Sequence, residues 1–171
     1  MLNRILTLAV FAVLMASSGR ASQESGKNPL LDHDLVNADR KTVGGETVRS
    51  AELIGIYFSA HWCPPCRAFT PRLVDFYEQV KEDGQSFEVV FVSGDRSKAD
   101  MFDYMTSAEM PWPALPHTEA RALFRSYRVQ GIPALIVLDR EGNIVTRKGR
   151  QHVIESKEDA FAGWKRRAVR D

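Results

Sequence analysis

The stretch LIGIYFSAHWCPPCRAF, residues 53–69, decides the fold, because an apolar strand runs there into a helix through the chain's only two cysteines. Its opening LIGIYFS is a short apolar and aromatic run, typical of a strand buried in a mixed or parallel sheet. The helix that follows carries apolar residues at helical spacing, namely Phe69, Leu73, Phe76 and Val80. It is predicted to end at Gly84, since glycine commonly follows a helix. We therefore expect the cysteine pair at a strand-to-helix junction.

The segments beyond this junction continue the alternation of strands and helices. Helices are predicted at residues 97–107, 118–129 and 156–170, and strands at residues 87–93, 134–138 and 144–147. The last two strands are close enough in sequence to form an antiparallel hairpin. The proline-rich residues 110–117 are expected to form an extended loop, and Gly44 with Gly45 marks an earlier hairpin or turn. The order predicts an α/β fold with a mixed central β-sheet.

Length and composition indicate one ordinary globular domain. The chain has 171 residues, of which 44% are hydrophobic and 26% charged. We place the domain at residues 41–171, after a partly flexible leader at residues 22–40. The net charge of +1 argues neither for a nucleic-acid surface nor for a strongly acidic partner. No nucleic-acid partner is therefore expected, and the protein is expected to be a monomer.

The N-terminus is typical of a secretory signal peptide at residues 1–21. Arg4 precedes the apolar run ILTLAVFAVLMA, and small residues follow it. Cleavage is expected after Ala21, with Ser18 as the second choice. The run is shorter than the roughly 20 apolar residues that a membrane span needs, so no stable membrane insertion is expected after cleavage. The mature chain is expected to be secreted across the inner membrane into the periplasm, although an endoplasmic-reticulum signal has a similar form.

The two cysteines, Cys63 and Cys66, are better suited to redox chemistry than to stabilising the fold. Exported proteins are often stabilised by disulfides, but this chain has no second pair of cysteines. The loop that a Cys63–Cys66 disulfide closes is so short that it would restrict the unfolded chain little. A helix N-terminus favours the thiolate form of a cysteine, which makes Cys63 the expected nucleophile and Cys66 the resolving thiol. Pro64 and Pro65 fit the first helical turn and restrict the loop between them.

A zinc site and an inert disulfide are the two alternative interpretations of the pair. Structural zinc needs four ligands, and the remaining candidates show no paired spacing. These are His33, His61, His117 and His152. We therefore expect no metal and no other cofactor. An inert disulfide would not need the strand-loop-helix setting.

These residues carry a resemblance to a known family. YFSAHWCPPCRAFTPRL resembles the active-site segment of the thioredoxin superfamily, and WCPPC followed by RAFTP is similar to its tryparedoxin and nucleoredoxin branch. The resemblance covers roughly residues 51–150. It implies a thioredoxin-like fold with helices on both faces of the sheet, and protein disulfide reductase activity. It also implies that Trp62 forms part of the substrate-binding rim, that Pro133 is a cis-proline beside the disulfide, and that Ile132 offers main-chain bonds to a bound peptide.

The chain departs from many thioredoxins at Tyr57, where they have a buried aspartate that serves as a proton acceptor. The general base is therefore unassigned, and the neighbouring His61, expected to face solvent, is a weak candidate. Tryparedoxins receive electrons from a specialised dithiol cofactor inside the cell, which an exported protein is not expected to share. The electron donor is thus unidentified, with a membrane thiol relay as one candidate.

Taken together, the sequence predicts an exported thiol–disulfide oxidoreductase that reduces or isomerises disulfides in protein substrates. A narrower alternative is a dedicated reductant for apocytochrome c maturation. A different class is a non-catalytic binding or chaperone module, for which Trp62, Trp112 and the proline-rich loop would form an exposed aromatic surface. The basic residues 164–170 indicate a solvated helix face more than a lipid contact.

Overall fold

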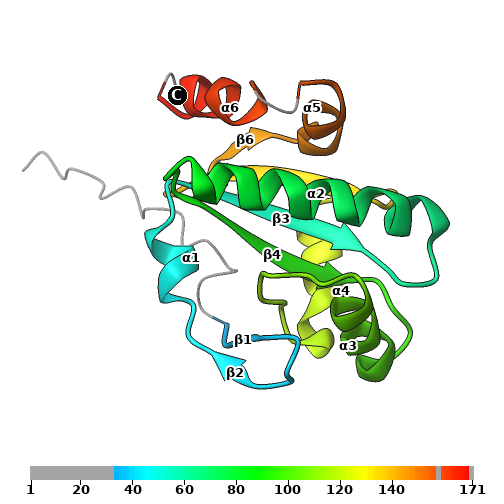
Figure 1. The fold of residues 1–171 in the computed structure, drawn as a ribbon. Helices are drawn as coiled ribbons and strands as arrows, with labels where there is room; N and C mark the ends of the chain where they lie inside the picture. The colour runs from blue at the N-terminus through cyan, green and yellow to red at the C-terminus, as the bar shows by residue number, and fades with distance from the viewer. Residues whose placement is uncertain (1–32, 157–158, 170–171) are drawn as a thin grey trace, which may run out of the picture.

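A computed structural model describes residues 33–156 and 159–169, so the expected signal peptide lies outside the described residues. Figure 1 shows a central sheet with helices packed on both of its faces. In the described part of the chain, no helix combines the length and apolar character that crossing a membrane would require.

The central sheet has four strands in the order β4-β3-β5-β6. Strand β3 (Leu53–Ser59) pairs in parallel with β4 (Phe87–Ser93) and antiparallel with β5 (Ala134–Asp139). Strand β6 (Ile144–Thr146) completes the predicted hairpin with β5. Every residue of β3 and β4 is buried, as the uninterrupted apolar runs indicate. The expected mixed sheet is confirmed.

Helices cover the two faces of the sheet because successive strand side chains point to opposite sides. One core cluster joins one set of strand residues to α2 (Pro64–Glu82), α3 (Lys98–Ser107), α5 (Gly149–Glu155) and α6 (Ala160–Ala168). The other joins the alternate set to α1 (Glu46–Ser50) and α4 (His117–Ser126). The N-cap of α3 is Ser97, as predicted, and its hydroxyl accepts a hydrogen bond from the Asp100 amide.

The domain begins before its expected start at residue 41. Strand β1 (Leu35–Val36) pairs with β2 (Thr42–Val43), and the side chain of Leu35 is fully buried in the core. The amides and carbonyls of Val36 and Ala114 also exchange two hydrogen bonds. Part of the expected leader therefore belongs to the folded domain.

The proline-rich loop does not expose Trp112, so that part of the expected aromatic surface is wrong. The loop backbone lies along the outer side of β4, where the Phe91 amide donates to Pro113 and the Phe91 carbonyl accepts from Leu115. This pairing turns Trp112 inward, and its indole is only 1% exposed. The ring packs edge-on against two buried tyrosines, and its Nε1 has no hydrogen-bond partner among the described residues.

The C-terminal region contains two helices where one was predicted. Helix α5 was not predicted at all, and α6 begins at Ala160, later than the expected residue 156. Trp164 on α6 is fully buried, and its indole N–H donates to Nδ1 of His152 on α5 over 2.9 Å. This bond joins the two helices to each other. The basic residues of α6 gather in its last turn, where they suit the helix dipole.

The His152–Trp164 bond makes stability depend on pH. Because Nδ1 accepts this bond, it carries no proton, and burial with nearby Arg167 lowers the pKa of His152. The folded state therefore favours the neutral ring. The stability it gives is present above the ordinary pKa of about 6.5 and is lost as the pH falls below it.

We expect the melting temperature to fall more between pH 7.5 and pH 5 in the wild type than in His152→Gln, whose amide oxygen can accept the bond without titrating. Thermal denaturation followed by circular dichroism at the two pH values measures this difference. Equal falls in the two proteins would contradict the assignment.

Candidate active site

The cysteine pair lies where β3 passes into α2. Cys63 is the N-cap of α2, and Cys66 lies in its first turn with Pro64 and Pro65 between them. The two cysteines form a disulfide with their Cα atoms 5.2 Å apart. Their placement at a helix start follows the prediction. Cys63 is only 4% exposed, and Cys66 is fully covered.

The loop before β5 packs against the disulfide. The peptide bond between Ile132 and Pro133 is cis, which confirms the prediction for Pro133. Ile132 packs against the cysteines, and its carbonyl oxygen lies 3.9 Å from Sγ of Cys63. Residues far apart in sequence thus meet around one sulfur atom.

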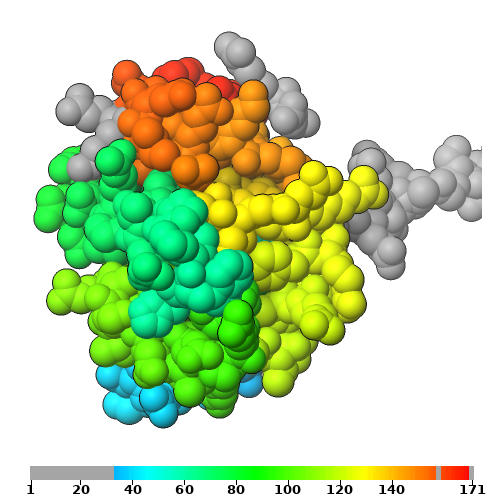
Figure 2. Space-filling model, turned by 90° about the vertical axis from the view of Figure 1, so that its right-hand side faces the viewer, coloured from blue at the N-terminus to red at the C-terminus, as the bar shows by residue number. Residues whose placement is uncertain are grey.

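Trp62 forms the outer rim of this site. Its side chain is 56% exposed, although its Nε1 donates a hydrogen bond to the Gly94 carbonyl over 3.0 Å. The bond holds the ring in place while leaving its face open to solvent. Figure 2 shows this end of the molecule, with the turquoise start of α2 at the centre and the yellow segment before β5 beside it.

A network of buried hydroxyl groups surrounds Tyr57, the position at which the sequence lacks the aspartate of many thioredoxins. The Tyr57 hydroxyl is hydrogen-bonded to Thr70, which also bonds to Tyr104 and donates to the Cys66 carbonyl. Ser59 bonds to the same Tyr104 hydroxyl. Burial, with a smaller effect of Tyr104, raises the pKa of Tyr57 far above its ordinary value. Tyr57 therefore stays protonated and is not a base at neutral pH.

Asp95 is the polar residue of the site that the sequence reasoning missed. One of its carboxylate oxygens accepts the His61 amide over 2.7 Å, and the other accepts the Ser93 hydroxyl over 2.8 Å. The side chain is buried, and this burial raises the pKa of its carboxyl group. The signal was present in the sequence, because an acid separated from β4 only by Gly94 lies near the end of the parallel strand β3.

His61 is more enclosed than expected. Its ring stacks on Tyr104 with the ring centres 5.3 Å apart, and the residue is half-buried. Its carbonyl accepts a hydrogen bond from the Arg67 guanidinium. The amide and the carbonyl of His61 thus both fix the loop that carries Trp62 and Cys63.

Two hollows open beside this loop. The first, of about 400 Å³, is lined by His61, Trp62, Arg67, Asp95, Arg96 and Asp100. The second, of about 760 Å³, continues past Asp95 and Arg96 to α4. In the residues that the structure describes, no three metal-binding side chains gather into a possible ion site.

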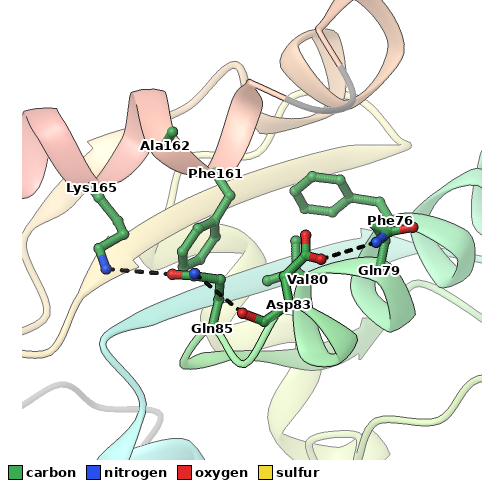
Figure 3. A pocket seen from close by; sticks show the side chains of 8 residues that line it. All are labelled: Phe76, Gln79, Val80, Asp83, Gln85, Phe161, Ala162 and Lys165. Carbon is green, nitrogen blue, oxygen red and sulfur yellow. Dashed lines mark hydrogen bonds between the residues drawn. The ribbon is translucent and has the colours of Figure 1, made fainter.

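A further pocket lies far from the cysteines (Figure 3). It is formed by the C-terminal half of α2 and by α6, and its lining includes Phe76, Asp83, Phe161 and Lys165. Since α2 has 19 residues, its two ends are about 28 Å apart. This pocket is therefore separate from the candidate active site.

Comparison with known proteins places these features in a family context. A family model described as "Thioredoxin-like" matches residues 51–144. Nucleoredoxin of Danio rerio is 46% identical over 138 residues, which cover 79% of this chain and 32% of that protein. Tryparedoxin of Trypanosoma brucei brucei is 41% identical over 113 residues, which cover 64% of this chain and 76% of that protein. The chain thus spans about a third of the nucleoredoxin and most of the tryparedoxin.

Solved structures agree with the sequence relatives. A thioredoxin from Wuchereria bancrofti has a TM-score of 0.68 at 39% identity, covering 81% of this chain and 97% of that one. Tryparedoxin II complexed with glutathionylspermidine has a TM-score of 0.65 at 35% identity, covering 74% of this chain and 88% of that one. The expected thioredoxin-like fold and the resemblance to tryparedoxins and nucleoredoxins are confirmed.

Proposed function

Because the chain belongs to the thioredoxin-like family and closes Cys63 and Cys66 into a disulfide, we propose that it is a thiol–disulfide oxidoreductase acting on other proteins. The observation that carries the proposal is the position of this pair. It lies at the start of α2, against the Ile132 carbonyl and beside the exposed Trp62. A vicinal pair in this setting can alternate between dithiol and disulfide.

The reaction consists of two successive thiol–disulfide exchange steps. In the reduced protein, the Cys63 thiolate attacks one sulfur of the client disulfide, forms a mixed disulfide and releases the other client sulfur as a thiolate, which takes up a proton. The Cys66 thiol then loses its proton, attacks Sγ of Cys63 and releases the second client sulfur as a thiolate, which takes up that proton. The client gains two electrons and two protons, and the protein is left with the Cys63–Cys66 disulfide.

The dipole of α2 supports the attacking thiolate, since partial positive charge gathers at a helix N-terminus. Each turnover requires an external dithiol to reduce the pair again. We propose a membrane thiol relay as this donor, because the chain is proposed to work outside the reducing cytoplasm.

The proposal that the chain is exported rests on its N-terminal sequence. The basic residue, the short apolar run and the small residues up to Ala21 support secretion across the inner membrane and work in the periplasm. Fractionation of cells expressing the full chain tests this. A cleaved form in the periplasm is expected, whereas an uncleaved cytoplasmic form would overturn the location and leave the chemistry standing.

Insulin reduction and the equilibrium redox potential test the activity. The dithiol form is expected to reduce insulin catalytically when dithiothreitol is supplied, and its potential against glutathione is expected near or below about −230 mV. A potential near about −120 mV would indicate a protein that introduces disulfides instead. No acceleration of insulin reduction would refute the proposal.

The number of different clients that the protein reduces distinguishes a dedicated reductant from a general reductase. A Cys66→Ser variant that traps one dominant client, an apocytochrome c, would favour the dedicated reductant. Many trapped clients would favour the general reductase. The burial of Trp112 removes one of the two tryptophans on which the binding or chaperone alternative depended.

A further inference from the structure

A continuous groove leads from the rim of the disulfide to the surface of α4. Its two hollows share Asp95 and Arg96, so a bound chain can pass from one to the other without leaving the surface. Trp62 stands at one end, and Phe124 of α4 lies at the other. In Figure 2, the green connection between β4 and α3 lies beside the yellow-green α4, below the start of α2.

The groove has an excess of available positive charge. Its lining includes three exposed arginines, Arg67, Arg96 and Arg121. No carboxylate of the described residues forms an ion pair with any of the three; Arg67 bonds only to a backbone carbonyl. An exposed guanidinium without a partner can bind a carboxylate through two parallel hydrogen bonds.

The two acidic residues of the lining offset only part of this charge. Asp95 is buried, and both of its carboxylate oxygens already accept hydrogen bonds from within the protein. Asp100 is exposed and accepts the Ser97 hydroxyl at the start of α3. The lining thus has three arginines against two aspartates, an excess of one positive charge beside the cysteines.

We propose that this groove binds an acidic segment of the client, next to the client's disulfide. The inference rests on the proposed function and adds the substrate class. The occupant is a polypeptide because the groove begins at Trp62, on the rim of the site where the client's disulfide reacts. Its carboxylates pair with Arg96 and Arg121, and apolar side chains beside them pack on Trp62 and Phe124.

Two matched peptide substrates test the preference. They have the same length and one disulfide each, and differ only in four flanking residues that are all glutamate or all lysine. At low salt, kcat/KM is expected to be about tenfold higher for the acidic peptide, and the ratio is expected to approach one in 0.5 M salt. An acidic peptide without cysteines is expected to inhibit competitively.

Charge-reversal variants locate the effect. In Arg96→Glu and in Arg121→Glu, the acidic-to-basic ratio of kcat/KM is expected to fall about tenfold. Arg166→Glu is the matched control, since Arg166 is exposed on α6, lines neither hollow and makes the same change in net charge. Its ratio is expected to equal that of the wild type.

Several outcomes would overturn the inference. Equal rates for the two peptides would do so, as would an equal effect of Arg166→Glu, because net charge alone would then explain the preference. A rate preference without inhibition by the cysteine-free peptide would indicate long-range attraction and no groove binding. Absence of turnover for every disulfide would instead refute the proposed function, and this inference with it.

Discussion

A Cys63→Ser variant is expected to reduce disulfides about a thousandfold more slowly than the wild type, or more slowly still. Cys63 is the N-cap of α2 and the less covered of the two cysteines, so it alone can begin the exchange with a client. Serine keeps the size of the side chain, but its hydroxyl does not form a nucleophilic anion at neutral pH. Insulin reduction in the presence of dithiothreitol measures the loss.

The Cys66→Ser variant provides the matched comparison. It keeps the attacking thiol but cannot resolve the mixed disulfide, so a client is expected to accumulate on Cys63 and to be visible by mass spectrometry without reductant. Clients trapped by Cys63→Ser and not by Cys66→Ser would show that Cys66 attacks first and would reverse the two assignments.

A Trp164→Ala variant is expected to lower the free energy of unfolding by about 3–5 kcal/mol. The indole is fully buried and packs against Phe76 and Phe87, with ring centres 5.4 and 5.8 Å away. Its N–H also holds His152 of α5. Alanine removes the packing and the bond together, and leaves a cavity between α6 and the sheet. Urea denaturation at pH 7.5 measures the change.

Two further variants separate the contributions to this loss. Trp164→Phe keeps most of the ring packing but removes the N–H, so it is expected to cost clearly less than alanine. Arg166→Ala changes an exposed residue of the same helix and is expected to shift stability by less than about 0.5 kcal/mol. A similar loss in all three variants would show that α6 contributes through its backbone alone.

Local patterns predicted the central elements well. The apolar runs of β3 and β4 and the helical spacing of α2 were read correctly, because each is a continuous segment with one strong period. Trp112 was misread for the opposite reason. Its loop has no period of its own, and its orientation is fixed by hydrogen bonds to Phe91, which is distant in sequence. Helix α5 has only seven residues, too few to show an amphipathic repeat.

The residues of the candidate site likewise fall into those that local sequence predicts and those that depend on tertiary contacts. Cys63 and Cys66 stand together in the sequence and were found directly, whereas the resemblance, and not spacing, led to Pro133. Asp95 was missed because its role depends on the parallel pairing of β3 with β4, which brings its carboxylate to the His61 amide. The buried hydroxyl network around Tyr57 likewise exists only once α2 and α3 have packed on the sheet.

The proline-rich loop along β4 has a consequence for a protein proposed to handle partly unfolded clients. An outermost strand presents unpaired amides and carbonyls that can capture another extended chain and start aggregation. Here Phe91, in the middle of β4, is already bonded to Pro113 and Leu115, and Ala114 in turn is bridged to β1. At the opposite edge, β6 has only three residues. Clients are therefore expected to contact side chains and the loop that contains Ile132. The edges of the sheet offer few unpaired backbone amides and carbonyls to which a client strand could add non-specifically.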